Sequence, residues 1–356
     1  MTTTASRTST VSRTTASAAV AESAADAEPV TGLPAPGRVV TGDRPTGGLH
    51  LGHYFGTLAN RVRLQQQGCE LFVLVADYQV ITDRDRPVSL PELRTSMVLD
   101  YLACGIDADT SVIFAHSAVP ALNQLLVPFL SLVSTGELDR NPTVKEEIRT
   151  AGRASVNGLM MTYPVHQAAD ILFCKAELVP VGKDQLPHLE LTRSIARRFN
   201  ERYGPVFPLP EGLLGEVGTL LGLDGRKMSK SLGNGIALSD SPDEVAAKVR
   251  RARTDSERRI SYRPQSRPEV ANLLILAGLC LGVDPRLVAD RVGAGGAAEL
   301  KRVVIDSVND LLAPIRARRA SFGPDDAAEI LRRGAERARE IADRTLAEVN
   351  AAMQMG

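Results

Sequence analysis

The sequence predicts an α/β domain with a doubly wound parallel sheet, followed by a region built only of helices. Short apolar runs alternate with helical patterns from Gly37 to about residue 203, as a parallel sheet requires. Beyond residue 241 the helical periodicity continues without a strand pattern. A length of 356 residues suits two such domains.

The strands are expected where brief, strongly apolar runs occur between turn residues. Four segments fit this description: 38–41, 70–76, 111–115 and 178–181. The segment 70–76 contains Leu-Phe-Val-Leu-Val, a nearly continuous apolar run typical of a strand buried on both faces. The loops that follow these strands should gather at one edge of the sheet, where doubly wound folds bind ligands. They comprise 41–48, 77–83, 116–119 and 182–184.

Helices are expected between these strands. Their patterns cover 54–67, about 91–104, much of 120–174, and 185–203. Asn141-Pro142 and Asn157-Gly158 should break the third of these stretches, because proline and glycine interrupt helices and asparagine favours caps.

The C-terminal third is predicted to be all-helical. Ser241 supplies a cap and Pro242 a first-turn proline, so a helix should begin there. Further patterns cover about 268–282, 284–293, 298–319 and 324–353. The last helices carry many arginines: Arg316, Arg318, Arg319, Arg332, Arg333, Arg337 and Arg339. Their charge alone favours solvated faces balanced by Glu and Asp, with contact to RNA as the alternative.

Composition excludes little. Lysine plus arginine equals aspartate plus glutamate at 42 each, so no overall positive field attracts nucleic acid. The four cysteines are scattered without a C-x-x-C pair, which predicts buried free thiols in a reducing compartment. No apolar run approaches the length of a membrane span.

The N-terminal tail differs from the rest. Residues 1–28 are rich in Ser, Thr and Ala and have no acidic residue before Glu22, so the extension 1–37 is predicted to be disordered. An organellar transit peptide has a similar composition. We favour a bacterial cytoplasmic protein with a dispensable tail.

Two short motifs indicate phosphate chemistry. His50-Leu51-Gly52-His53 opens the first predicted helix, and a helix N-terminus attracts phosphate through its unpaired N–H groups and dipole. The two imidazoles are three residues apart and share one helix face. Lys227-Met228-Ser229-Lys230-Ser231 lies among glycines and is expected to form a cationic flap over pyrophosphate. Either motif alone could be a helix cap or a solvated loop.

The pair of motifs, in this order, resembles the HIGH and KMSKS motifs of class I aminoacyl-tRNA synthetases. The segments 161–172, 179–185 and 188–193 are similar to tryptophanyl-tRNA synthetases and unlike the tyrosyl enzymes. This resemblance covers about 38–353. It implies a Rossmann-type catalytic domain over 38–240 and a helical anticodon-binding region over 241–356.

The resemblance also implies substrates, partners and site residues. It implies ATP with Mg²⁺ held mainly by the phosphates, L-tryptophan, tRNA(Trp), a homodimer, a cytoplasmic location and no metal-binding residues. The implied catalytic residues are His50, His53, Lys227 and Lys230. The implied ATP contacts are Arg44, Pro45, Thr46, Gly52, His53, Gly182, Lys183, Asp184, Lys227, Met228, Ser229, Lys230 and Ser231. The implied tryptophan contacts are Asp170, Tyr163, Gln167, Gln185, Gln79 and Val181.

Asp170 is a carboxylate in an otherwise apolar helical stretch. By itself it suggests a cap or an ion pair with Lys175 or an arginine. In the resemblance it accepts the indole N–H, which suits a group that only accepts and a ligand that only donates. Such a polar contact can discriminate by about 10⁴–10⁵. Tyr163, seven residues earlier, either packs on the substrate ring or belongs to the core.

Several positions depart from the usual pattern of the family. Many bacterial relatives have Thr at position 50, Asn at 53 and His at 79, where this chain has His50, His53 and Gln79. Val40, Gln167 and Lys183 replace a usual Phe, Met and acid, respectively. Activity is still expected, with altered affinity and altered sensitivity to tryptophan-like inhibitors. The chain also contains no tryptophan, which suggests an auxiliary copy that can be made while charged tRNA(Trp) is scarce.

Three other functions remain open from the sequence. A tyrosyl-tRNA synthetase would share the fold and both ATP motifs. An adenylyltransferase that makes a cofactor precursor could carry the H-x-G-H segment, but it would lack the long helical region. A non-catalytic paralogue could bind tRNA or tryptophan as a regulator, although the intact His50, His53, Lys227 and Lys230 argue against this.

Overall fold

The computed structural model describes residues 37–81, 89–151, 156–214, 220–228 and 232–355. Within these residues a five-stranded sheet has the order β3-β2-β1-β4-β5, with every neighbouring pair parallel. The strands are β1 (Arg38–Asp43), β2 (Glu70–Val75), β3 (Val112–Ala115), β4 (Leu178–Val181) and β5 (Glu211–Leu214). The four expected strands and the doubly wound parallel fold are therefore confirmed.

Strand β5 was not expected from the sequence. Its residues Glu-Gly-Leu-Leu are mostly exposed at the edge of the sheet, where they pair only with β4 among the described strands. An edge strand with one covered side needs no continuous apolar run, so the pattern used to find the other four was missing here.

The helices of the first half follow the expected breaks. They are α2 (Leu51–His53), α3 (Ala59–Gln66), α4 (Leu90–Cys104), α5 (Ala121–Leu130), α6 (Thr135–Arg140), α7 (Pro142–Ala151), α8 (Gly158–Leu172) and α9 (Leu186–Tyr203). A wider π-helical turn, Tyr54–Leu58, joins α2 to α3. Asn157 caps α8 by accepting from the Met160 N–H at 2.8 Å, which explains the break at that position.

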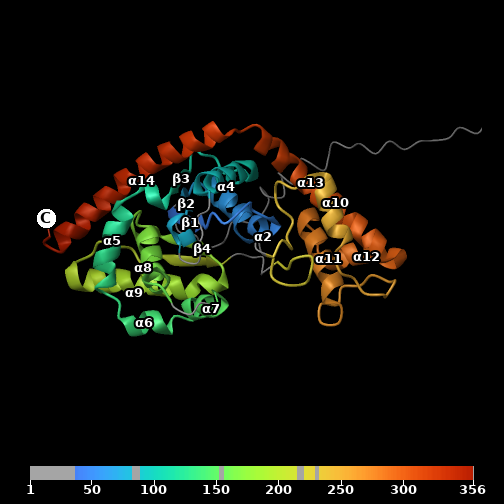
Figure 1. Ribbon diagram of the computed structural model, residues 1–356, viewed down its shortest axis with the longest axis horizontal. Helices are drawn as coiled ribbons and strands as arrows, with labels where there is room; N and C mark the ends of the chain where they lie inside the picture. Colours follow the sequence, from blue (N-terminus) through green and yellow to red (C-terminus); the bar gives the residue numbers. More distant parts are fainter. Residues whose placement is uncertain (1–36, 82–88, 152–155, 215–219, 229–231, 356) are drawn as a thin grey trace, which may run out of the picture.

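The C-terminal region is helical, as expected. It contains α10 (Pro242–Arg250), α11 (Pro268–Leu281), α12 (Pro285–Val292), α13 (Gly296–Ala320) and α14 (Pro324–Ala352). Ser241 caps α10 by accepting from the Glu244 N–H. Figure 1 shows α13 leading back from the helical end of the molecule and α14 crossing the sheet domain.

The last helix packs directly on the sheet. A Cβ atom at Gly334 would lie 1.9 Å from the Ile113 carbonyl oxygen, so only glycine allows α14 to approach β3 this closely. Near the other end of the helix, the Thr345 hydroxyl donates to the Phe173 carbonyl at 2.7 Å. The C-terminal helix is thus a structural cover for the edge of the sheet.

Both faces of the sheet are buried. Leu71, Val73 and Val75 face one apolar cluster, which continues through α4 into α11 and α13. Phe72 and Leu74 face the other, formed with α5, α8, α9 and α14. This alternation at every second residue is the pleat of a strand covered on both sides. The helical region and the sheet consequently share one apolar core.

The arginines of the last two helices make contacts within the chain. Arg319 pairs with buried Asp100 at 2.7 Å, and Arg318 donates to the Ala103 carbonyl at 2.7 Å. The others contact Asp240, Glu329, Glu336, Asp109, Glu340 and Ala118. These contacts favour the interpretation of these seven arginines as structural and solvated side chains.

The cysteines and the helices agree with the composition. Cys69, Cys104, Cys174 and Cys280 are all buried and free, as predicted. In the described part of the chain, no single helix is long and apolar enough to cross a membrane. The pair 268–281 and 285–320 meets that test only when taken together, and it is bent by 108°.

Candidate active site

The first motif forms the start of a helix. His50 is extended and caps α2, because its Nδ1 accepts from the Gly52 N–H at 3.1 Å. His53 Nδ1 in turn accepts from the His50 N–H at 3.3 Å. Since both Nδ1 atoms accept, each neutral ring carries its proton on Nε2. The two rings lie 3.9 Å apart, so the cap itself presents two neighbouring N–H donors.

The second motif lies against this helix start. The Leu51 N–H donates to the Ile236 carbonyl at 3.0 Å, and the Leu238 N–H donates to the Leu49 carbonyl at 2.9 Å. These two bonds join the chain just after the lysine-rich loop to the beginning of α2. Segments almost two hundred residues apart in the sequence are therefore neighbours.

Met228, the second residue of the lysine-rich motif, lies close to the start of α2. It is buried, and a Cβ atom at Gly52 would lie 2.9 Å from the His50 ring and 3.4 Å from the Met228 sulfur. A Cβ at Gly235 would lie 2.8 Å from Met228 Cγ. Lys227, next to this anchor, is exposed. The candidate residues Ser229, Lys230 and Ser231 lie outside the described residues.

The base of the lysine-rich loop is held by side-chain amides. Asn234 Nδ2 donates to the Lys227 carbonyl at 3.1 Å and to Asp224 Oδ1 at 2.8 Å. From α11, Asn272 Nδ2 donates to the Gly222 carbonyl at 3.0 Å. The helical region therefore contacts the loop that carries Lys227.

The turn after β1 begins at Asp43, whose side chain is held by two partners. Asp43 Oδ2 accepts from Arg61 at 2.6 Å and from the Tyr101 hydroxyl at 2.8 Å. Burial is the largest single effect on Asp43 and opposes its ionisation, but the charge of Arg61, the hydrogen bonds from Arg61 and Tyr101 and the charge of His53 together outweigh it and hold the pKa of that carboxyl well below its usual range. This buried ion pair anchors the end of β1, from which the predicted ATP contacts Arg44, Pro45 and Thr46 follow.

Arg44 connects several predicted contacts. Its Nε donates to Gln79 Oε1 at 3.2 Å, and its Nη2 lies 3.0 Å from Glu147 Oε1. Its guanidinium carbon lies 5.5 Å from the centre of the Tyr163 ring, a cation–π contact. The structure thus brings Arg44, Gln79 and Tyr163 together. Glu147 was not predicted, because an acid in an ordinary helix gives no sequence signal.

The loop after β4 lies beside this turn, because β4 pairs with β1. Val181 ends β4 and is buried, whereas Gly182, Lys183 and Asp184 are exposed. The Asp184 carbonyl accepts from the Thr143 hydroxyl at 2.9 Å, which ties the loop to α7. Gln185 is half-buried at the start of α9, and Gln167 is half-buried on α8. The predicted loops therefore meet at the carboxyl edge of the sheet.

Asp170 has a partner that the sequence did not predict. Its Oδ2 lies 2.7 Å from Nε2 of His116, and both side chains are buried. Lys175, one of the expected partners, pairs with Glu348 instead, so that interpretation was wrong. Asp170 Oδ1 is buried and has no hydrogen-bond partner among the described residues. The only sequence signal for His116 was its place directly after the third strand.

Two further rings surround this carboxylate. His116 lies 4.8 Å from His166 and stacks on Tyr78 at 6.0 Å between ring centres. His166 Nε2 lies 3.1 Å from Asn123 Oδ1, and burial lowers the pKa of His166. One potential ligand atom from each of His116, His166 and Asp170 lies within 4.8 Å of the others, close enough to hold a metal ion. The sequence had predicted no such group.

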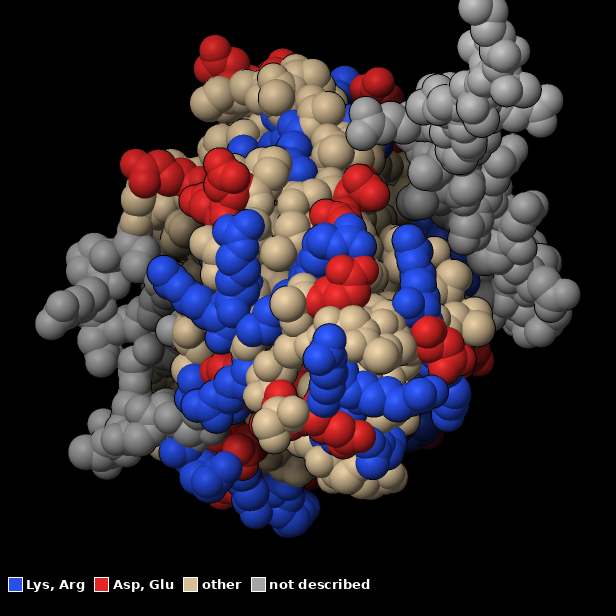
Figure 2. All heavy atoms as spheres, turned by 90° about the vertical axis from the view of Figure 1, so that its right-hand side faces the viewer, with Lys and Arg blue, Asp and Glu red and all other residues tan. Residues whose placement is uncertain are grey.

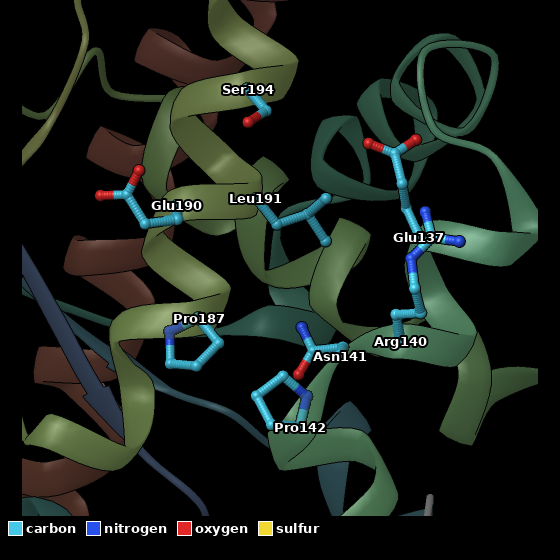
Figure 3. A pocket seen from close by; sticks show the side chains of 8 residues that line it. All are labelled: Glu137, Arg140, Asn141, Pro142, Pro187, Glu190, Leu191 and Ser194. Carbon is cyan, nitrogen blue, oxygen red and sulfur yellow. The ribbon is translucent and has the colours of Figure 1, made fainter.

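A surface pocket lies elsewhere, between α6, α7 and α9 (Figure 3). It is lined by Glu137, Arg140, Asn141, Pro142, Pro187, Glu190, Leu191 and Ser194. None of the predicted site residues lines it. We therefore place the candidate site at the sheet edge, where the predicted residues converge, and not in this pocket.

The chain is similar to one protein family and to individual members of it. Residues 34–313 match the family described as tRNA synthetases class I (W and Y). The tryptophan–tRNA ligase of Treponema pallidum is 45% identical over 325 residues, 89% of this chain and 96% of the relative. The tryptophanyl-tRNA synthetase structure from Mycoplasma pneumoniae has a TM-score of 0.78 at 28% identity, covering 90% of this chain and 98% of that one.

A second solved structure shows what a relative binds. The tryptophanyl-tRNA synthetase from Campylobacter jejuni, complexed with ADP and tryptophan, is 30% identical to this chain with a TM-score of 0.76. It matches 89% of this chain and 99% of that one.

Proposed function

The chain belongs to the class I tRNA synthetases of the W and Y group, and we propose on this premise that it is a tryptophan–tRNA ligase. It activates L-tryptophan with ATP and transfers the amino acid to tRNA(Trp). The single observation that carries this function is the 45% identity to a tryptophan–tRNA ligase over almost the whole length of both chains.

The first step is an in-line displacement at phosphorus. The tryptophan carboxylate attacks the α-phosphorus of ATP, the bond to the bridging oxygen breaks, and tryptophanyl-adenylate and pyrophosphate form. The attacking carboxylate is already ionised, so the step needs no general base. A terminal ribose hydroxyl of tRNA(Trp) then takes the acyl group and AMP leaves. Catalysis of the first step therefore consists of positioning and of stabilising charge on the phosphates.

We assign this charge stabilisation to His50, His53, Lys227 and Lys230. The Nε2–H donors of the two imidazoles at the start of α2 support the assignment, as does the position of Met228 beside exposed Lys227, since the Met228 sulfur and the His50 ring both lie within 3.4 Å of a Cβ built at Gly52. Arg44, Pro45, Thr46, Gly52, Gly182, Lys183, Asp184 and the rest of the lysine-rich loop complete the proposed ATP contacts.

Mg²⁺ fits this site only as an ion held by the phosphates. Mg²⁺ takes oxygen ligands in octahedral geometry, whereas the described residues closest to the two motifs offer imidazole N–H groups and ammonium. Two carboxylates near the first motif are already committed: Asp43 to Arg61 and Tyr101, and Asp100 to Arg319 and the Leu49 N–H. We infer that the ion, when bound, neutralises phosphate charge and that the chain supplies no ligand to it.

Tryptophan recognition is assigned to Asp170 with Tyr163, Gln167, Gln185, Gln79 and Val181. Asp170 Oδ1 is buried and has no partner in the described part of the chain, which supports its role as acceptor of the indole N–H, because burying an unpaired acceptor is costly and a bound donor removes that cost. A ligand without this N–H, or with a donor elsewhere, leaves the acceptor unpaired.

We further propose that the region 241–356 binds the tRNA anticodon, that 38–240 is the catalytic domain, and that the enzyme is a cytoplasmic homodimer. Figure 2 views the helical end of the molecule, where Lys and Arg are interspersed with Asp and Glu. Arg250, Arg251, Arg253, Arg258 and Arg259 are exposed in and after α10. These residues suit RNA contact better than the arginines of α13 and α14, which are engaged within the chain.

We also infer that this is an auxiliary copy, because a chain without tryptophan can be synthesised when charged tRNA(Trp) is scarce. Its messenger should rise under tryptophan limitation or inhibition of the housekeeping enzyme. An unchanged transcript level under both conditions would refute the auxiliary role while leaving the activity intact.

The activity itself is tested by ATP–pyrophosphate exchange with each of the twenty amino acids. Exchange should depend on tryptophan, and charging should be confined to tRNA(Trp). Exchange with tyrosine, or none with any amino acid, would contradict the proposed function.

A further inference from the structure

Behind Arg44 lies a chain of buried polar side chains that connects Tyr163 to two residues, Asn141 and His188, to which no role has been given above. It begins at Asn141, which precedes α7 and lies on the wall of the pocket in Figure 3. It continues through His188 on α9 to Tyr163 on α8. Exposed fractions of 7%, 1% and 1% show that Asn141, His188 and Tyr163 are all buried, so their polar atoms are expected to find hydrogen-bond partners within the chain.

The orientation of the first amide is fixed by the backbone. Asn141 Oδ1 accepts from the Thr143 N–H at 3.0 Å and from the Val144 N–H at 3.3 Å. A flipped amide would turn its NH₂ group toward these two donors, so the oxygen must be on that side. Nδ2 is therefore the atom that lies 3.3 Å from His188 Nδ1, and it donates.

This donation decides the tautomer of the histidine. His188 Nδ1 must be unprotonated to accept from Asn141, so the neutral ring carries its proton on Nε2. Nε2 lies 3.0 Å from the Tyr163 hydroxyl oxygen and donates to it. Burial, reinforced by the charge of Arg44, lowers the pKa of His188 to about 4, in agreement with a ring that stays neutral.

The tyrosine hydroxyl accepts from His188 and must direct its own proton elsewhere. After burial, the charge of the Glu147 carboxylate is the largest cause of the raised pKa of Tyr163. Glu147 in turn pairs with Arg44, whose guanidinium lies over the Tyr163 ring. The hydrogen bonds from Asn141 to His188 and from His188 to Tyr163 therefore each have one allowed direction, and the contact of the Tyr163 ring with Arg44 extends the chain to the turn after β1.

We propose that His188 is a positioning residue, which as the Nε2–H tautomer holds the Tyr163 hydroxyl, keeps the Tyr163 ring against the Arg44 guanidinium, and thereby fixes Arg44 for ATP and Gln79 for tryptophan. The inference rests on the proposed function, because it is through Arg44 and Tyr163 that His188 acts on the substrates. It needs no contact between His188 and either substrate.

The tautomer is tested on the wild-type protein by long-range ¹H–¹⁵N NMR of labelled histidine, which distinguishes protonated from bare ring nitrogens. The chain has five histidines, and the His188 signal is assigned by its loss in His188→Gln. A protonated Nε2 and a bare Nδ1 near neutral pH are expected. A proton on Nδ1 would overturn the proposal whether or not the enzyme activates tryptophan.

The effect of His188 on Arg44 is tested by two variants whose side-chain amides occupy the positions of different ring nitrogens. The Gln side chain places its amide near the position of Nε2, whereas the Asn side chain reaches only the position of Nδ1. We expect His188→Gln to retain kcat/KM for ATP within about threefold and His188→Asn to lose about tenfold, the cost of one buried hydrogen bond. The reverse order, or equal activity of the two variants, contradicts the proposal.

A double-mutant cycle joins His188→Asn to Tyr163→Phe. If His188 acts through the tyrosine hydroxyl, the double variant should be no slower than the worse single variant, because both remove the same interaction. If the loss of kcat/KM in the double variant equalled the product of the two single losses, the chain of contacts would be refuted. Arg149→Ala, which breaks only an exposed pair with Glu146 on α7, is the control and should match wild type. Tryptophan-dependent exchange by wild type keeps a failure of this inference distinct from a failure of the proposed function.

Discussion

Asp170 Oδ2 lies 2.7 Å from Nε2 of His116, and this pair directs the other carboxylate oxygen to a place where no described residue satisfies it. A buried carboxylate held from one side is a fixed acceptor for a ligand that approaches from the other. The arrangement converts a residue that looked ambiguous in the sequence into the strongest candidate for substrate discrimination.

Replacement of this acceptor should therefore damage tryptophan recognition. We expect Asp170→Asn to raise KM for tryptophan about 100-fold or more, since sites built around one polar contact lose at least this much when it fails. Tryptophan-dependent ATP–pyrophosphate exchange measures the effect. Lys175→Gln, in the turn that follows the same helix and paired with Glu348, should leave KM unchanged. A KM within twofold of wild type for Asp170→Asn would remove Asp170 from the pocket.

Removal of a lysine from the lysine-rich motif should slow adenylate formation and leave tryptophan binding unchanged. Lys227→Ala and Lys230→Ala should each lower the rate of adenylate formation by about 10²–10³-fold, because each removes a charge that stabilises the phosphates in the transition state. Tryptophan affinity, measured by calorimetry, should stay near wild type. The matched control is Arg226→Ala, which removes a neighbouring charge paired with Asp224. Near-normal exchange in both lysine variants would refute their assignment.

The contact between the motifs makes Gly235 critical. A Cβ atom there would lie 2.8 Å from Met228 Cγ and 3.5 Å from the His50 ring, so Gly235→Ala must displace Met228. We expect slower adenylate formation and a loss of stability of about 1–3 kcal/mol, measured by pre-steady-state kinetics and urea unfolding. Gly56→Ala, where nothing lies within 4 Å, should be neutral. Wild-type kinetics in Gly235→Ala would show that this packing is unimportant.

Packing of the last helix depends on another glycine. A methyl group at Gly334 would overlap the Ile113 carbonyl oxygen at 1.9 Å, and the backbone atom cannot rotate away. Gly334→Ala should separate α14 from β3 and cost at least about 2 kcal/mol in the free energy of unfolding. Gly158→Ala, a helical position with nothing within 4 Å, should be neutral or stabilising. Equal urea midpoints for the two variants would contradict the packing.

The neutral ring of His188 makes stability depend on pH. Its pKa falls from 6.5 to about 4 on folding, so between these values the unfolded chain binds more protons and stability rises with pH. Above the pKa of His188 in the unfolded chain, the neutral ring makes its full contribution to the free energy of unfolding. Roughly 3 kcal/mol of that contribution is lost as the pH falls from there through the pKa of His188 in the folded protein. Urea unfolding at about pH 5 and pH 7.5 should show a smaller pH dependence for His188→Gln than for wild type. An identical dependence would contradict the burial of a neutral ring.

Prediction from the sequence worked best where a pattern is local. The strands β1 to β4, the breaks before Pro142 and at Asn157, and the cap at Ser241 are set by short-range chemistry, and the structure confirms them. It failed for β5, whose exposed edge position leaves no apolar signature. It also failed for the partner of Asp170, because His116 lies 54 positions away in the chain and reaches it only through the sheet order.

The sequence by itself determined the kind of chemistry. Imidazoles at a helix start, a lysine-rich loop and a carboxylate in an apolar helix can be recognised from residue types and their spacing alone. The tertiary structure alone decided which groups meet. The pairing of Leu51 with Ile236, the seat of Met228 between Gly52 and Gly235, and the tautomer of His188 all arise from contacts across the fold. Local preferences act over a few residues. Close packing brings together atoms from distant segments and determines which atom of each hydrogen bond donates and which accepts.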